Sequence, residues 1–313
     1  MRTIEVIKGG ALSTVQDLGR YGYQRYGVPV SGALDQFALR VGNLLVGNEE
    51  SDAGLETTFL GPTLRFHFDA TIAVTGGDLT PVLDGQPVPG WASLSVPQGS
   101  TLSFKGPRDG IRSYVCVRGG IDVPTVMGSR STFTRSQFGG FRGRAVATGD
   151  MLPVADRGSD APQSGARSLA PLTVPHYGRH HALRVTMGPQ DDAFTTAGID
   201  TFVASEFTVT PVFDRMGYRL EGPVIQHKKS ADIVSDGTSR GAVQVPGSGK
   251  PIVLLADCGT TGGYTKIATV ISADLPRMAQ AQPGDTVAFR PVCLDEAHRA
   301  LSEQEAFIAS LRS

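Results

Sequence analysis

The 313-residue sequence contains few cysteines, a single tryptophan, little charge and no long apolar run. Its cysteines, Cys116, Cys258 and Cys293, form no CxxC pair, which fits neither a disulfide framework nor a zinc site. The longest apolar run, at 252–256, is far shorter than the roughly 20 residues that span a bilayer. The first residues carry no apolar segment of the kind that a signal peptide requires. We therefore expect a cytoplasmic protein with reduced thiols and no membrane span.

The sequence also lacks an excess of charge of either sign. Its 29 basic and 30 acidic residues give a net charge of -1, so no long-range field attracts nucleic acid or an anionic membrane. Hydrophobic residues make up 40% of the chain, which is ordinary for a folded protein. We expect neither nucleic acid nor a membrane as a partner.

Glycine and proline are abundant, with 39 and 20 residues, and favour many turns between short strands. Residues 156–167 are rich in Gly, Ser, Asp and Pro, show no periodicity and are interpreted as a linker or long loop. A second strand-rich stretch follows at 183–292. Strands are predicted at 71–74, 94–96, 102–104 and 114–117, with a turn at hairpin spacing at 96–99.

Two segments are predicted to be helical. Apolar residues from Leu34 to Leu45 recur with a helical period, with Ser31 as a possible N-cap and Gly47 as a stop. Near the C-terminus apolar residues share one helical face at 297–301. Residues 302–305 there have the pattern of a capping box, which predicts a last short helix.

Two sequence motifs lack the context that their chemistry needs. Residues 237–241 read GxSxG, but the residues that follow are typical of a strand and not of the helix of a nucleophile elbow. Residues 247–250 resemble part of a phosphate loop, but Pro251 stands where a Mg²⁺-binding hydroxyl is required. Neither motif predicts its usual activity here.

Three histidines, His176, His180 and His181, have a spacing that could serve a metal on a helix. Neighbouring proline and glycine argue against a helix, and no carboxylate motif accompanies them. We interpret them as part of a solvated loop and predict no metal site.

The most distinctive segment follows the apolar strand at 251–256. It combines threonines, paired glycines, a carboxylate and an ammonium group, and loops held by rigid strands commonly carry function. Paired glycines also let a ligand approach the backbone closely. A hairpin with solvated polar tips explains the same composition equally well. The residues concerned are Asp257, Thr260, Thr261, Gly262, Gly263, Tyr264 and Lys266.

A second cluster contains Arg215, Tyr218 and Arg219. In an extended segment Tyr218 and Leu220 share one face and Arg219 lies on the other. The two guanidinium groups offer planar forks to a carboxylate or phosphate. The alternative is a pair of surface ion bridges to the acidic neighbours at either end, which contribute little to stability.

A third cluster joins Asp17 and Arg20 to Asp35 and Asn43 of the first predicted helix. Positions eight apart lie within roughly 80° of one another around a helix. These side chains could line the same cleft as the other candidate residues, or they could hold the helix against the barrel. Both interpretations remain open.

A series of ordered motifs along the chain resembles a known family. The chain resembles the C subunit of 5-oxoprolinase, also called allophanate hydrolase subunit 2 or KipI antagonist, a family related to the biotin-dependent carboxyltransferase domain of urea carboxylase. The resemblance covers the full length. It is carried by residues 14–20, 32–35, 43–48, 112–114, 119–124, 128–132, 215–220, 244–246 and 260–264.

The resemblance implies a mainly β fold with a few short helices, in two cyclophilin-like β-barrel domains. We expect the first domain, with one amphipathic helix, at 1–155, a linker at 156–181, and the second domain, with C-terminal helices, at 182–313. It also implies two partners, a cyclophilin-like protein similar to the B subunit of 5-oxoprolinase and an A subunit of the LamB/YcsF family.

The complex that is resembled opens 5-oxoproline to L-glutamate at the expense of ATP, with Mg²⁺. The first expectation is therefore a component of an ATP-dependent, lactam-opening amidohydrolase that is active only with its partners. One alternative is a carboxyltransferase that moves CO₂ from carboxybiotin to a urea-like amide. Another is a non-catalytic regulator that antagonises a kinase inhibitor by binding it. The chain lacks the Met-Lys-Met segment that carries biotin and a GGSSG-like amidase nucleophile.

Within this resemblance we assign Arg215 and Arg219 to the substrate carboxylate or a phosphate, and Lys266 to the negative charge that develops during the reaction. Asp257 is a possible base. Family members usually have Gln and Pro where this chain has Gly259 and Thr265, which places the exact substrate in question. The carbonyl would be oriented and the wall completed by Thr260, Thr261, Gly262, Gly263, Tyr264, Gln244 and Tyr218, with Asp17, Arg20, Asp35 and Asn43 as further candidates.

Overall fold

The computed structural model describes residues 2–156 and 167–312, so part of the predicted 156–181 linker, 157–166, lies outside the described residues. The chain divides into two compact units. Unit 1 contains Met1–Tyr21, Ser31–His176 and Ser310–Ser313, and unit 2 contains Gly22–Val30 and Tyr177–Ala309. The observed division therefore departs from simple chain order, because the segment Gly22–Val30 is grouped with the later residues.

Unit 1 consists of two antiparallel sheets with orders β11-β1-β4-β9-β6-β7 and β2-β3-β10-β5-β8. Both sheets contribute β-branched and aromatic side chains, such as Val6, Phe66, Val74 and Val115, to one buried core. These side chains suit a pleated, buried surface. The strands are β1 (Thr3–Lys8), β2 (Leu12–Gln16), β3 (Gly54–Thr58), β4 (Thr63–Phe66), β5 (Ala70–Asp78), β6 (Pro81–Leu83), β7 (Gln86–Pro87), β8 (Ser93–Val96), β9 (Thr101–Phe104), β10 (Asp109–Val117) and β11 (Met151–Pro153).

The four strands predicted from the sequence of this region are confirmed within β5, β8, β9 and β10. The predicted hairpin at 96–99 is wrong, because β8 pairs with β5 while β9 pairs with β4 and β6. The turn leads from one sheet to the other, and the Gly99 amide donates to the Phe66 carbonyl oxygen at 2.7 Å. A local turn pattern does not specify which strand its neighbour will join.

The first predicted helix is α1 (Gln36–Leu45), and it buries most of its residues. Its N-cap is Asp35, whose carboxylate accepts a hydrogen bond from the Ala38 amide at 2.9 Å. The prediction of Ser31 as the cap is therefore wrong; Ser31 lies four residues earlier in the left-handed conformation, with φ of 56°. The helix stops before Gly47, as predicted.

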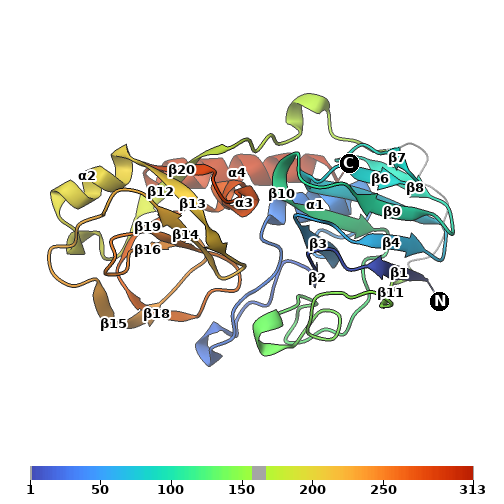
Figure 1. Ribbon diagram of the computed structural model, residues 1–313, viewed down its shortest axis with the longest axis horizontal. Helices are drawn as coiled ribbons and strands as arrows, with labels where there is room; N and C mark the ends of the chain where they lie inside the picture. Colours follow the sequence, from blue (N-terminus) through green and yellow to red (C-terminus); the bar gives the residue numbers. More distant parts are fainter. Residues whose placement is uncertain (1, 157–166, 313) are drawn as a thin grey trace. The chain divides into compact units, whose positions relative to one another are not determined.

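Unit 2 is built on a closed barrel of strand order β12-β19-β16-β17-β14-β13-β20, and a two-stranded sheet of β15 and β18 lies beside it (Figure 1). Leu183, Phe207, Val243 and Val287 fill the barrel. The strands are β12 (His180–Met187), β13 (Glu206–Phe213), β14 (Gly217–Glu221), β15 (Asp232–Gly237), β16 (Ala242–Gln244), β17 (Ile252–Leu254), β18 (Thr261–Tyr264), β19 (Lys266–Val270) and β20 (Thr286–Pro291). With the two sheets of unit 1, this confirms the mainly β fold.

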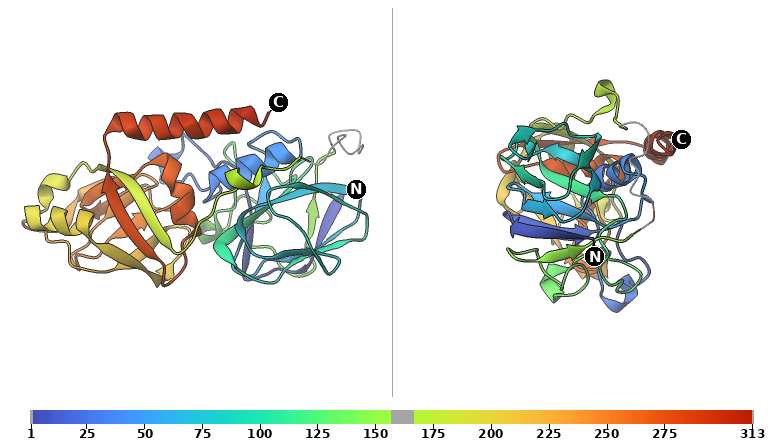
Figure 2. Two further views of the ribbon diagram at one scale, coloured as in Figure 1. Left: turned by 90° about the horizontal axis from the view of Figure 1, so that it is seen from above. Right: turned by 90° about the vertical axis from the view of Figure 1, so that its right-hand side faces the viewer.

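The remaining helices of four or more residues are α2 (Thr196–Ala204), α3 (Leu275–Gln280) and α4 (Leu294–Ser310). The separate short helix predicted to open at Ser302 is wrong, because α4 runs through that position without a break (Figure 2). The Ser-Glu-Gln-Glu pattern consists of residues that a continuing helix also accepts, so it cannot mark a start by itself. Among the described residues, no helix is both long and apolar enough to cross a membrane.

Candidate active site

The two arginines of the second cluster point to different environments. In β14, Tyr218 and Leu220 are buried and Arg219 is exposed, which confirms the predicted alternation. Arg215, just before the strand, is buried, and its guanidinium Nε and Nη2 lie 2.9 and 3.3 Å from the two carboxylate oxygens of Asp257. The surface ion bridge that we considered as an alternative for Arg215 is therefore replaced by a buried pair.

The Asp257 carboxylate has both oxygens turned towards this guanidinium. Its proposed role as a base stays a prediction, and its observed role is to hold Arg215. The neighbouring Cys258 is buried, and burial raises the pKa of its thiol. Cys258 therefore stays protonated near neutral pH and is a poor nucleophile.

Lys266 opens β19 with a buried side chain that reaches a partially exposed acid. Its Nζ lies 2.8 Å from the Asp236 Oδ2, and the exposed fractions of the two side chains are 5% and 54%. The Lys266 ammonium holds the pKa of the Asp236 carboxyl below its usual value. Gln190 contacts both residues, since its Nε2 lies 3.4 Å from Asp236 Oδ2 and its Oε1 accepts the Lys266 amide at 3.1 Å.

Gln244 lies opposite Lys266 in the pairing of β16 with β19. The residue is buried, and within the described chain its Nε2 has no hydrogen-bond partner. This nitrogen faces Gly262, because a Cβ built on that glycine would approach it to 2.5 Å. Gly262 in turn lies opposite Asp236 in the pairing of β15 with β18.

These contacts bring together Lys266, Asp236, Gln190, Gln244 and Gly262, which we call the Lys266 cluster. Three members were predicted from the sequence, and two were missed. Asp236 directly precedes the GxSxG motif, and this position was the one sequence feature that could have drawn attention to it. Nothing in the local sequence singles out Gln190.

The rest of the predicted loop is a short strand. Thr261 and Tyr264 are exposed at the ends of β18, while Gly262 and Gly263 are partly buried between them. Thr260 precedes the strand, and its carbonyl accepts the Thr238 amide at 3.1 Å. These residues lie around the cluster through β18, whose labelled strand lies next to β15 in Figure 1.

Thr265 follows β18, and it is buried and hydrogen-bonded through both its backbone and its side chain. Its amide donates to the Ala231 carbonyl at 2.9 Å, a bond that proline could not make, and its hydroxyl lies 3.0 Å from His227 Nε2. Gly259 accepts a hydrogen bond from the Thr238 hydroxyl at its carbonyl oxygen. The Thr265 amide and hydroxyl thus make contacts that proline could not make. The contact of Gly259 uses only its backbone carbonyl, which glutamine would also have.

The four candidates of unit 1 have buried structural partners. Asp17 accepts hydrogen bonds from the Ser129 hydroxyl and the Arg130 amide, both at 2.6 Å. Asp35 caps α1, and the Asn43 amide donates to the Asp52 carbonyl at 2.8 Å. The guanidinium of Arg20 donates to the Ser131 carbonyl and lies 4.8 Å from the centre of the Phe138 ring. These contacts favour the second interpretation, in which the residues hold α1 and its neighbouring loops in place.

Most of the chain, including the whole Lys266 cluster, matches a known family. A model described as the carboxyltransferase domain, subdomains A and B, matches residues 26–291. The chain belongs to this carboxyltransferase family.

Members of the family with curated names include two that match over nearly their whole length. The C subunit of 5-oxoprolinase from Escherichia coli is 38% identical, over 98% of this chain and 97% of that protein. The C subunit of 5-oxoprolinase from Haemophilus influenzae is 36% identical, over 99% and 97%. The urea amidolyase of Saccharomyces cerevisiae is 34% identical, but the chain spans only 18% of it.

Solved structures support the same carboxyltransferase fold. The crystal structure of Kluyveromyces lactis urea amidolyase matches 99% of this chain with a TM-score of 0.93 and 32% identity. The chain spans 20% of that larger protein. The crystal structure of TTHA0988 matches 93% of this chain with a TM-score of 0.83 and 32% identity, and the chain spans 55% of it.

Two motifs set aside earlier can now be placed in the structure. Strand β16 directly follows the GxSxG segment, where a nucleophile elbow requires a helix, so the segment is not a nucleophile elbow. The solvated-loop interpretation is wrong for His181, which is buried in β12 with its Nε2 3.2 Å from Asp285 Oδ2. The alternation of β12 buries this histidine and exposes its neighbour His180.

Proposed function

We propose that this chain is the C subunit of an ATP-dependent 5-oxoprolinase complex. The observation that carries the proposal is the match to two curated 5-oxoprolinase C subunits over 97% of each relative. A match of this extent leaves no large segment of those relatives without a counterpart. The Lys266 cluster supplies the chemistry that such a component would bring.

In the proposed reaction two water molecules are consumed, one for opening the lactam and one for converting ATP to ADP and phosphate. The oxygen of water adds to the lactam carbonyl carbon of 5-oxoproline and the ring C–N bond breaks. The nitrogen takes up a proton, the product is L-glutamate, and ATP is converted to ADP and phosphate. Negative charge develops on the carbonyl oxygen, where fixed donors are most effective in a site that excludes water. Lys266 supplies an ammonium group on a side chain that is only 5% exposed.

Gln244 would act beside Lys266 as a neutral donor. Its Nε2 is already desolvated and lacks a partner in the described structure, so a substrate oxygen would gain a hydrogen bond without displacing one. Gly262 leaves the space above this nitrogen open, since a side chain there would collide with it. Asp236 is more than half exposed and can turn to water when a substrate oxygen takes its place at Lys266.

The phosphate-loop-like segment at 247–250 does not have the contacts expected of a nucleotide site. Lys250 of the phosphate-loop-like segment pairs with the Glu221 carboxylate at 2.6 Å, and the described residues contain no group of three potential metal ligands. We therefore derive no step through Mg²⁺-ATP here and propose that ATP is bound at the level of the complex. The proposed partners are a protein similar to the B subunit of 5-oxoprolinase and an A subunit of the LamB/YcsF family, in the cytoplasm.

The test is reconstitution. The chain is co-purified with the candidate A and B subunits, and ATP hydrolysis and L-glutamate formation are measured with and without 5-oxoproline. We expect 5-oxoproline to stimulate both, and the stimulation to vanish when this chain is omitted. The proposal would be contradicted if the A and B subunits alone gave the same turnover as the complete complex.

A second candidate function rests on the structural match to urea amidolyase, with its TM-score of 0.93. In a carboxyltransferase, carboxybiotin would supply the carboxyl group to the substrate's amide nitrogen, and the amide proton would pass to the biotin that is released. The Lys266 cluster would stabilise negative charge on the amide oxygen. Carboxylation of urea in the presence of a biotinylated carrier, with no response to 5-oxoproline, would favour this function. The regulator hypothesis stays a prediction, and binding to the B-type partner without turnover in either assay would favour it.

A further inference from the structure

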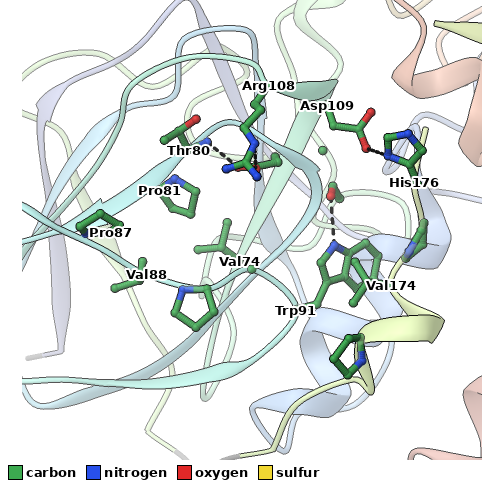
Figure 3. Close-up of a pocket in the computed structure, with 17 residues that line it drawn as sticks. Val74, Thr80, Pro81, Pro87, Val88, Trp91, Arg108, Asp109, Val174 and His176 are labelled. Carbon is green, nitrogen blue, oxygen red and sulfur yellow. Dashed lines mark hydrogen bonds and ion pairs between the residues drawn. The ribbon is translucent and has the colours of Figure 1, made fainter. Parts of the chain in front are cut away.

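Unit 1 contains a cavity of about 550 Å³ that plays no part in the proposed reaction. It lies where β5 ends and β6 and β10 begin, and the segment at 171–176 forms another side. Small-molecule sites typically have volumes of about 300–1,000 Å³. The cavity is therefore large enough for a small organic ligand (Figure 3).

The floor of the cavity is apolar. Figure 3 shows Val74, Val88 and Trp91 around it, and proline rings at 81, 87, 89, 171 and 175 add surface without amide donors. The Trp91 Nε1 already donates to the Gly76 carbonyl at 3.2 Å. Trp91 therefore offers a ligand the surface of its ring and no free hydrogen-bond donor.

The rim carries one available positive charge, on Arg108. Its side chain is 78% exposed, and its Nε lies 3.6 Å from Asp78 Oδ2, beyond hydrogen-bond distance. Within the described residues the guanidinium has no closer partner. The other rim carboxylate, Asp109, pairs with His176 Nδ1 at 2.9 Å. Arg108 thus makes a loose ion pair with Asp78 but no hydrogen bond to it, so its planar fork can receive a ligand carboxylate through two hydrogen bonds.

The backbone at the cavity is strained. Thr80 and Trp91 have φ of 55° and 56°, in the left-handed region that favours glycine. Each is held there by a hydrogen bond, from the Trp91 amide to the Val74 carbonyl at 2.7 Å and from the Thr80 amide to Asp78 Oδ1 at 2.8 Å. Strained residues of this kind gather at binding sites, where the surrounding structure fixes their conformation.

We propose that this cavity binds small carboxylates with an apolar body. The carboxylate pairs with the Arg108 guanidinium, and the body lies against Val74, Val88 and Trp91. The charge on Arg108 selects the anion, and the apolar floor excludes small polar acids.

The test uses the fact that Trp91 is the only tryptophan of the chain. Its fluorescence is titrated with 4-methylpentanoate and with the neutral analogue 4-methylpentanamide, and its indole resonance is followed by NMR. We expect saturable binding of the acid with a dissociation constant of about 0.1–1 mM, and binding of the amide at least about tenfold weaker.

Two variants and one control locate the site. Arg108→Gln should weaken binding of the acid about tenfold and leave the amide unchanged. Gly90→Val should weaken both probes, because a Cβ there makes only an ordinary contact, at 3.5 Å from the Val74 carbonyl, and its methyl groups occupy the cavity. The control, Arg65→Gln, removes an equally loose ion pair, at 3.7 Å from Glu5 with 47% exposure, and should change nothing.

Several outcomes would overturn the proposal. They are the absence of a saturable change in both signals up to about 20 mM acid, equal affinity for acid and amide, and equal weakening by Arg108→Gln and Arg65→Gln. Thermal melting of each variant shows that the protein is folded in every titration.

Discussion

In unit 2, Arg215 and Lys266 are both buried basic residues that pair with an aspartate, but the two aspartates differ in their exposure to water. Arg215 and Asp257 are both buried, with exposed fractions of 6% and 4%. Lys266 is equally buried at 5%, but its partner Asp236 is 54% exposed. We call Arg215–Asp257 the closed pair, because both side chains are buried, and Lys266–Asp236 the open pair, because its carboxylate is exposed to water.

Solvation decides what each pair can do. Two fully buried charges need one another, because neither can recover its hydration when the other is removed. An exposed carboxylate can exchange its partner for water at little cost. Arg215 and Asp257 therefore depend on one another within the barrel. In the proposed function, Lys266 releases Asp236 to water and receives a substrate oxygen.

The largest expected effect is from breaking the closed pair. Arg215→Met leaves the Asp257 charge buried without its partner and should lower the free energy of unfolding by about 3–5 kcal/mol, measured by urea denaturation at pH 7. The control Arg219→Met, on the exposed face of β14, should stay within about 0.5 kcal/mol of the parent. Similar values for the two variants would show that burial does not distinguish the arginines.

Removing the cation of the open pair should affect activity more than stability. Lys266→Met leaves Asp236 free to hydrate and should reduce turnover of the reconstituted complex about 100- to 1,000-fold with complex formation intact. Lys250→Met, whose partner Glu221 is exposed, is the matched control and should retain activity. Full turnover by the Lys266 variant would remove this residue from the proposed site.

The buried amide beside Lys266 allows a sharper separation of stability from function. Gln244→Met removes a desolvated Nε2 that has no partner in the described structure, so stability should be unchanged or rise by about 1 kcal/mol while turnover falls about tenfold. The control is Gln16→Met, since Gln16 is also buried but donates to the Thr132 carbonyl at 3.1 Å. That variant should be destabilised by about 1–3 kcal/mol. Loss of stability in both variants would contradict the assignment of a free donor.

The smallest effect concerns the titration of Asp236. Pairing with Lys266 lowers its pKa, so the stabilisation is fully present above the unfolded-state pKa and is lost as the pH falls through the lower folded-state pKa. In Lys266→Met the pKa of Asp236 should rise towards its ordinary value, and NMR titration of the side-chain carboxyl carbon measures this directly. An unchanged pKa would show that the pair does not persist in solution.

Much of the fold follows from local pattern. The alternation of Tyr218, Arg219 and Leu220 predicts their burial because a strand turns successive side chains to opposite faces. The helical period from Leu34 to Leu45 likewise predicts α1. The cap at Asp35 was missed because Ser, Asp and Asn are equally acceptable at this position, and the choice depends on the path of the incoming chain.

Pairing across the sequence could not be obtained in this way. Asp257 is 42 residues from Arg215, and Asp236 is 30 residues from Lys266. Gln190 is farther still, 76 residues from Lys266. A local period contains no information about which distant strand becomes a neighbour.

Residue order alone was enough to predict the mainly β fold, the resemblance to the 5-oxoprolinase and urea carboxylase family, and the segment that carries Gly262 and Lys266. Gln244 was named through the resemblance. The folded chain was needed to learn which carboxylate each cation meets and which of these pairs remains open to water. The register of β16 with β19 and of β15 with β18 sets those distances. The register of β16 with β19 depends on closure of the whole barrel, because each barrel strand must satisfy the backbone hydrogen bonds of two neighbours at once. The register of β15 with β18 is set in their separate two-stranded sheet.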